Sequence, residues 1–214
     1  DVINVDEKQS AFLQEIPDPI FREQMRDMLI NQQFRKDYWI KGPRRLSVLD
    51  KASAIKAQRV VLVKHPDEIE LNVTGALSKA NLTSEIYHPI LDALASHEPK
   101  SLAEIEADIK PKGLTLPQLL QSVFVLLGKG ALQPARDIPA IAAAQNQCER
   151  LNAYLIERAR SNDEVAYLAS PVTGGGIPLE RFKQLSLLAY QEGVEKPQQI
   201  AQYVWKIMET QGNK

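Results

Sequence analysis

The feature that most constrains the fold is the helical spacing of apolar residues in the second half of the chain. In residues 178–193 they fall at Phe182, Leu185 and Leu188, and in residues 196–211 they recur in steps of four. Each segment has a proline near its start, where a helix tolerates the missing N–H group. The pattern therefore predicts two closing helices.

A compact group of helices is predicted further upstream. Residues 88–99, 101–109 and 115–132 are typical of three short helices, and the last two open with the residue spacing of a capping box. Pro89 is expected near the first turn of the first helix. A turn and an extended piece at residues 131–135 follow. This order resembles a winged-helix module.

The first part of the chain mixes helix and strand signals. Asp18 is a candidate N-cap for a helix within residues 17–33. Residues 34–40, 59–65 and 68–77 are rich in β-forming residues or alternate in polarity, so we expect three strands. The apolar run inside residues 59–65 is typical of a strand buried on both faces.

These elements predict a helix-rich α+β protein. We expect a linker at residues 1–15 and a small mixed α/β unit at residues 16–80. A winged-helix-like module would occupy residues 81–214, with a long helix at 141–159, a strand at 164–171 and the two closing helices.

Composition places the chain among ordinary globular proteins. Its 214 residues are 44% hydrophobic and carry a formal net charge of −1, so no global field favours nucleic acid or an anionic membrane. The single cysteine, Cys148, excludes an internal disulfide framework and fits a reducing compartment. No apolar run approaches the ~20 residues that a membrane span needs. We expect a soluble cytoplasmic protein, cut from a longer chain because no initiating methionine is present.

Binding of DNA by the winged-helix-like region is not favoured by its charges. The helix that would enter the major groove, residues 116–127, contains no lysine or arginine. The preceding helix carries Glu104, Glu106 and Asp108. Phosphate contacts require cations, so this pair of helices would repel a nucleic acid.

The sequence carries no pattern typical of a catalytic or metal site. His65, His88 and His97 are scattered, without the spacing of zinc ligands. Cys148 has no accompanying oxyanion motif. The glycine triplet in residues 170–180 lacks both phosphate-loop and dinucleotide-loop spacing, and a flexible turn is the better interpretation. We therefore expect a non-enzymatic fragment that binds no cofactor of its own.

The least ordinary stretch is Asn31–Ser47, where five basic residues accompany one acid, Asp37, and three aromatic side chains. One interpretation is an edge strand with inward aromatics and solvated cations. The other is a surface for an acidic or peptide partner, since arginine pairs with carboxylates and stacks on rings. In the second interpretation the contact residues are Arg35, Trp39, Lys41, Arg44 and Arg45. Arg35 is alternatively a structural partner of an acid such as Asp27.

Two segments resemble a known family. Residues 26–42, RDMLINQQFRKDYWIKG, resemble the start of the predicted methyltransferase regulatory domain. The family's Asn-Arg-x-Phe-Arg core and its preceding aspartate are matched at Asp27, Asn31, Phe34 and Arg35. Two positions depart from the pattern.

The departures are Gln32 in place of the usual arginine and Asp37 in place of a usual threonine. Residues 167–189, YLASPVTGGGIPLERFKQLSLLA, look like the C-terminal part of the same proteins, where a small-residue loop leads into a helix. The order of the intervening elements also agrees. The resemblance therefore extends over nearly the whole chain.

The resemblance implies an accessory region that follows an S-adenosylmethionine-dependent methyltransferase domain, in proteins some of which modify protein lysines. The implied partners are the tethered methyltransferase domain and a protein substrate, and an oligomer is compatible with this reading. S-adenosylmethionine would be bound by the parent protein, because no strand–GxGxG–helix motif occurs in these residues. The alternative is a winged-helix nucleic-acid-binding or protein-interaction module unrelated to methyl transfer.

Overall fold

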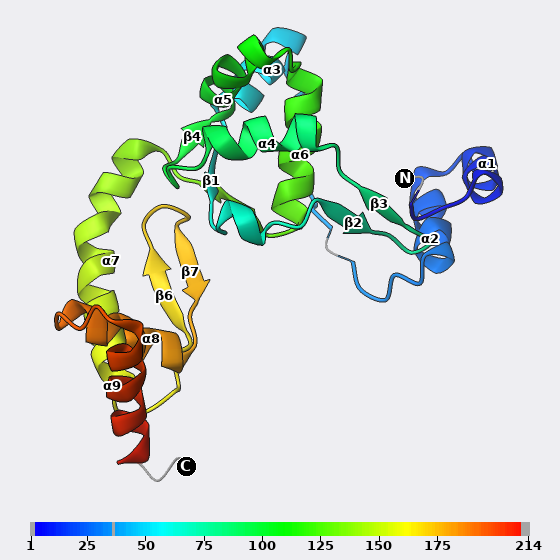
Figure 1. Ribbon diagram of the computed structural model, residues 1–214. Helices are drawn as coiled ribbons and strands as arrows, with labels where there is room; N and C mark the ends of the chain where they lie inside the picture. Colours follow the sequence, from blue (N-terminus) through cyan, green and yellow to red (C-terminus); the bar gives the residue numbers. More distant parts are fainter. Residues whose placement is uncertain (1–2, 36, 211–214) are drawn as a thin grey trace. The chain divides into compact units, whose positions relative to one another are not determined.

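The chain folds as a helix-rich α+β protein, as expected. The computed structural model describes residues 3–35 and 37–210 (Figure 1). The chain divides into two compact units. One comprises residues 1–57, 62–98 and 102–132, and the other residues 58–61, 99–101 and 133–214. The domain boundaries expected near residues 15 and 80 stay predictions.

The first unit is mainly helical. Its elements are α1 (Glu7–Glu15), α2 (Pro19–Leu29), α3 (Val48–Ala57), the 3-10 turn η1 (Pro66–Glu68), β2 (Asn72–Thr74), β3 (Lys79–Asn81), α4 (Ser84–Ala93), α5 (Leu102–Ile109), η2 (Lys110–Lys112) and α6 (Leu116–Gly128). The helix α3 was not expected. Its signal is a serine at residue 47 with an acid three residues later, and the Ser47 hydroxyl accepts from the N–H of Asp50 at 3.1 Å.

The N-terminal helices α1 and α2 contact each other (Figure 1). Residues 7–15, expected to be a linker, are helical because Asp6 and Gln9 form a capping box, with the Asp6 carboxylate accepting from the Gln9 N–H at 2.7 Å. The predicted cap of α2 is confirmed, since Asp18 Oδ1 accepts from the N–H groups of Ile20 and Phe21. A small cluster built around Val5, Leu13 and Ile16 packs the two helices together.

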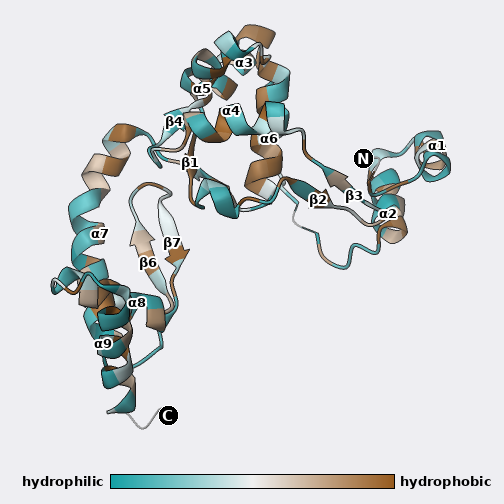
Figure 2. Cartoon of the chain, viewed as in Figure 1, coloured by the Kyte–Doolittle hydropathy of each residue, from teal (hydrophilic) through white to brown (hydrophobic). Residues whose placement is uncertain are grey.

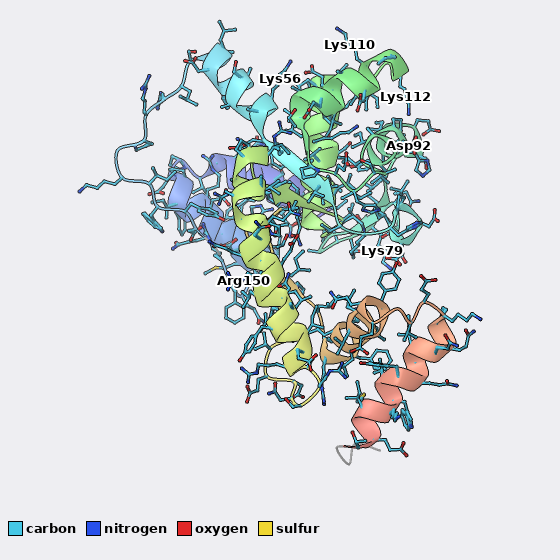
Figure 3. All side chains as sticks on the ribbon, turned by 90° about the vertical axis from the view of Figure 1, so that its left-hand side faces the viewer. Lys56, Lys79, Asp92, Lys110, Lys112 and Arg150 are labelled. Atoms are coloured by element: carbon cyan, nitrogen blue, oxygen red, sulfur yellow. The ribbon has the colours of Figure 1, made fainter. Side chains whose placement is uncertain are left out.

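Helices α4, α5 and α6 supply most of the buried core of this unit, and α4 contacts both others. The largest fully buried side chains in them are Ile90, Leu94, Ile105, Ile109, Leu119 and Leu126. Figure 2 shows apolar residues, in brown, along α6. The capping box predicted for α6 is confirmed, with the Thr115 N–H donating to Gln118 Oε1 at 2.9 Å. Ion pairs link Lys56 to Glu106 and Lys112 to Asp92, and Figure 3 labels Lys112 and Asp92.

The predicted position of Pro89 was wrong. Helix α4 begins at Ser84, so Pro89 lies inside the helix rather than in its first turn. The missing N–H removes one intrahelical hydrogen bond. The helix persists because Tyr87, Ile90 and Leu91 bury one face of it.

A short hairpin of β2 and β3 holds the N-terminal segment. Val73 faces Ala80 across the antiparallel pair. At the turn, the Leu77 N–H donates to the Ile3 carbonyl at 2.9 Å, and the Ala76 N–H donates to Asn4 Oδ1 at 3.1 Å. The Ile3 carbonyl oxygen lies only 2.3 Å from where a Cβ would stand on Gly75, so this approach requires glycine.

A three-stranded sheet has the order β4-β1-β5. Its strands are β1 (Arg59–Leu62), β4 (Lys100–Ser101) and β5 (Leu132–Ala135), and β1 pairs with β4 in antiparallel fashion. Burial of Val60, Val61 and Leu62 confirms the expected buried strand, although it is shorter than residues 59–65. The central strand β1 precedes α4, and the chain passes from β5 into α7. Whether these elements form a winged-helix module stays a prediction.

The second unit also contains α7 (Ile138–Arg158), β6 (Tyr167–Ser170), β7 (Gly175–Pro178), α8 (Arg181–Gln191) and α9 (Pro197–Glu209). The predicted helices are confirmed. Their core comprises Ile156, Ala159, Leu185, Leu188 and Val204.

The glycine triplet closes the β6–β7 hairpin. Gly174 adopts φ +72° in the turn, which glycine tolerates, whereas Gly175 and Gly176 lie in β7. Helix α8 begins only at Arg181, so the glycines do not open a helix as a phosphate-binding loop would.

Two side-chain carboxamides fix this hairpin. Asn152 on α7 bonds both backbone groups of Ala169, donating from Nδ2 to the carbonyl at 2.8 Å and accepting from the N–H at 2.7 Å. Gln184 on α8 is fully buried, and its Nε2 donates to the carbonyls of Val165 and Leu179 at 2.7 and 2.8 Å.

Candidate functional site

A pocket of about 1060 Å³ lies between α2 and the segment that follows it. Its lining comes wholly from residues 19–39 of the first unit. The lining residues are Pro19, Ile20, Glu23, Gln24, Asp27, Met28, Asn31, Gln32, Gln33, Arg35, Asp37, Tyr38 and Trp39.

Different apolar residues of α2 face α1 and the pocket. Met25 and Leu29 pack against the α1 cluster. Ile20 and Met28, eight residues apart and therefore on one side of the helix, line the pocket and are exposed. Arg22 fixes the helix by donating Nε to the Ile16 carbonyl at 2.9 Å. One helix thus holds its apolar pocket face open to solvent.

The chain turns back over α2 just after the helix ends. Asn31 adopts φ +54°, a left-handed conformation that asparagine tolerates better than most residues. The Gln32 N–H then donates to the Asp27 carbonyl at 2.8 Å, and the Gln32 side chain donates to the Phe34 carbonyl. Gln32 therefore shapes this turn.

Arg35, in the pocket lining, bridges two carboxylates. Its Nη1 lies 2.9 Å from Asp27 Oδ2 and its Nη2 lies 3.0 Å from Asp37 Oδ1. The hydrogen bonds to Asp37 and then Asp27 raise the pKa of the Arg35 guanidinium above its ordinary value. The predicted pairing of Arg35 with Asp27 is therefore confirmed.

The expected strand at residues 34–40 was wrong for the residues described there, and Lys36 lies outside them. Residues 34–35 and 37–40 pair with no strand. The aromatic side chains are not turned inward: Tyr38 is 93% exposed and Trp39 89% exposed. The β propensity of these residues did not make them a strand, because a strand forms only where a neighbouring strand pairs with its backbone N–H and C=O groups.

The structure separates the five residues that the sequence suggested for partner contact. Arg35 and Trp39 line the pocket. Lys41, Arg44 and Arg45 are exposed between α2 and α3, and none has a side-chain partner within the part of the chain that the structure describes. Whether these residues contact a partner stays a prediction.

The sequence reasoning missed the contribution of α2 to the site. Glu23 and Gln24 line the pocket beside Ile20 and Met28. The signal was present in the pattern, since the apolar arc of α2 is wider than its contact with α1 covers, and Ile20 and Met28 stay exposed.

Other kinds of site find no support in residues 3–35 and 37–210. No helix there combines the length and apolar character of a membrane span. No three His, Cys, Asp or Glu side chains of these residues gather where they could share a metal ion. The thiol of Cys148 is half-buried and free.

The segment that carries the pocket matches a known protein family. Residues 1–41 match the family model described as predicted methyltransferase regulatory domain. This confirms the resemblance for the N-terminal segment, and all pocket residues fall inside it. Residues 167–189 lie beyond the match, so their resemblance stays a prediction.

One relative is similar along the whole chain. It is an uncharacterized Synechocystis protein, 33% identical over 214 residues. The comparison covers all of this chain but 41% of that protein, so the chain spans less than half of the relative's length. No solved structure matches the chain.

Proposed function

We propose that this chain is a non-catalytic regulatory or substrate-recognition region of an S-adenosylmethionine-dependent methyltransferase that acts on protein. The observation that carries the proposal is the coincidence of two findings. The regulatory-domain match covers residues 1–41, and a pocket of about 1060 Å³ is lined entirely from residues 19–39.

The proposal assigns methyl transfer and S-adenosylmethionine binding to another part of a longer parent protein. The relative's greater length supports such a parent. The single cysteine, without a disulfide partner in the chain, supports a cytoplasmic location. Within this chain the role is contact with the tethered methyltransferase domain and with its protein substrate.

We assign contact with the tethered domain to the basic segment, defined as Lys41, Arg44 and Arg45. These cations are exposed and unpaired among the described residues. An acidic partner surface can therefore form ion pairs with them without breaking an existing one. Trp39 beside them supplies an exposed aromatic anchor, and aromatic residues are common in the centres of interfaces.

The experiment is methyl transfer from labelled S-adenosylmethionine by the parent protein into a whole-cell protein extract. The Arg44→Ala/Arg45→Ala variant is compared with wild type and with a control, Lys79→Ala/Lys110→Ala. The control also removes two positive charges, from two lysines elsewhere in the first unit (Figure 3). We expect a changed rate or a changed set of acceptors only in the first variant. Identical rates and acceptors in all three proteins would remove this assignment.

A further inference from the structure

We infer that the α2 pocket binds a basic amphipathic segment of a protein partner. The inference rests on the proposed function, and it names the class of partner that the pocket recognises. It concerns a surface next to the basic segment, which has the opposite charge; Trp39 belongs to the pocket and lies beside that segment in the sequence.

The pocket wall formed by α2 carries two parallel rows of side chains. Ile20, Gln24 and Met28 are spaced by four residues and form a mainly apolar row. Glu23 and Asp27 have the same spacing and form an acidic row beside it. A partner that follows this wall must present apolar side chains next to cations, which is the pattern of a basic amphipathic segment.

The charge of the described lining residues supports the same partner. Glu23, Asp27 and Asp37 oppose the single cation Arg35, which leaves a formal charge of −2. Arg35 is occupied by two carboxylates, whereas Glu23 has no partner within the described parts of the chain. An incoming lysine or arginine therefore finds acceptor oxygens, and an incoming acid finds no free cation in the lining.

The segment after α2 adds two aromatic side chains to the lining. Tyr38 and Trp39 line the pocket and are almost fully exposed. A ring face attracts a cation through its quadrupole, and it also packs against the methylene stem of lysine or arginine. Met28, also in the lining, is unbranched and adapts to partners of different shape.

The probe is a short fluorescent peptide of leucine and lysine with helical amphipathic spacing, titrated into the full 214-residue chain and followed by fluorescence anisotropy. A peptide with glutamate in place of every lysine is the matched probe. We expect binding of the lysine peptide only, and an affinity that falls with salt because charge pairs are screened. Equal or tighter binding of the glutamate peptide would overturn the inference.

Variants locate the binding. Glu23→Gln/Asp37→Asn removes two pocket carboxylates while leaving the Arg35–Asp27 pair in place, and we expect about fivefold to tenfold weaker binding, as for two exposed charge pairs. Trp39→Ala should weaken it by about tenfold, as for loss of an aromatic anchor. The control Asp163→Asn/Glu195→Gln removes the same charge from exposed positions in the second unit.

Weakening in the pocket variants but not in the control supports the inference. Equal affinities in the pocket variants and the control would place the peptide elsewhere and overturn it. This assay needs no methyltransferase domain, so its failure is separate from failure of the proposed function, which is judged by methyl transfer in the parent. A pocket that binds the peptide in a protein without methyl transfer would keep the inference and remove the proposed function.

Discussion

The guanidinium of Arg35 lies 2.9 Å from the carboxylate of Asp27, eight residues earlier on α2. The contact closes the chain back onto the helix that it has just left. Arg35 also donates to Asp37, two residues later, so one guanidinium links α2 to the segment that follows it. Arg35 thus lines the pocket while its guanidinium is held by two carboxylates.

Replacing Arg35 should loosen the pocket without unfolding the protein. We expect Arg35→Gln to raise the amide hydrogen exchange rate of Gln32 several-fold, since local opening requires only loss of local contacts. The midpoint of thermal unfolding should stay unchanged. Arg45→Gln, in the same exposed segment but without a partner among the described residues, is the control. Unchanged exchange in Arg35→Gln would show that the ion pairs do not hold the segment.

Gly75→Ala should release the N-terminal residues from the β2–β3 hairpin. The new Cβ would stand 2.3 Å from the Ile3 carbonyl oxygen, and overpacking of this kind costs about 1–3 kcal/mol. Urea unfolding followed by circular dichroism measures the loss. Gly128→Ala is the matched control, because no atom lies within 4 Å of its Cβ position. Equal stability of the two variants would contradict the close approach.

Asn152→Ala should destabilise the second unit. The substitution leaves the N–H and carbonyl of Ala169 without their side-chain partners, and loss of partly buried hydrogen bonds costs about 1–3 kcal/mol. The free energy of unfolding in urea gives the difference. Asn146→Ala on the same helix removes an exposed carboxamide and should change little. The idea fails if both variants unfold at the same urea concentration.

Tyr203 gives the second unit a dependence on alkaline pH. Burial, together with the hydrogen bond to Glu192 at 2.8 Å, raises the pKa of Tyr203 above its usual 10.0. The folded chain therefore keeps the phenolic proton where the unfolded chain has lost it. This contribution to stability is complete below pH 10 and decreases as the pH rises through the raised pKa.

Urea midpoints measured across that range test the Tyr203 prediction. Tyr203→Phe should show a shallower alkaline decrease than wild type, because phenylalanine has no proton to lose. Tyr190→Phe, at an exposed position of α8, should keep the wild-type slope. Parallel curves for all three proteins would exclude the linkage.

The sequence predicted most helices because their signals are local. Caps at Asp18 and Thr115 and the apolar spacing around Leu185 each lie within a few residues of the helix that they specify. The error at Pro89 has the same origin. Proline spacing suggests a helix start, but burial of Tyr87 and its neighbours extended the helix backwards, and burial depends on distant residues.

The candidate site was predicted only in part. Arg35 and Trp39 stood out by composition, whereas Ile20 and Glu23 became part of the site only through the chain reversal at Asn31. The strand expected at residues 34–40 shows the limit of local reasoning. Aromatic and β-forming residues favour a strand, but nothing in the sequence says whether a neighbouring edge exists to pair with it.

The buried carboxamide of Gln184 has a consequence for how the second unit assembles. It joins the carbonyls of Val165 and Leu179, the two ends of the β6–β7 hairpin, to a helix that is made later in the chain. The hairpin is thereby closed as a ring by non-covalent bonds, and its register is secured only once α8 has formed. Hairpin and helix should therefore behave as one cooperative unit, opening together in a single event rather than one after the other.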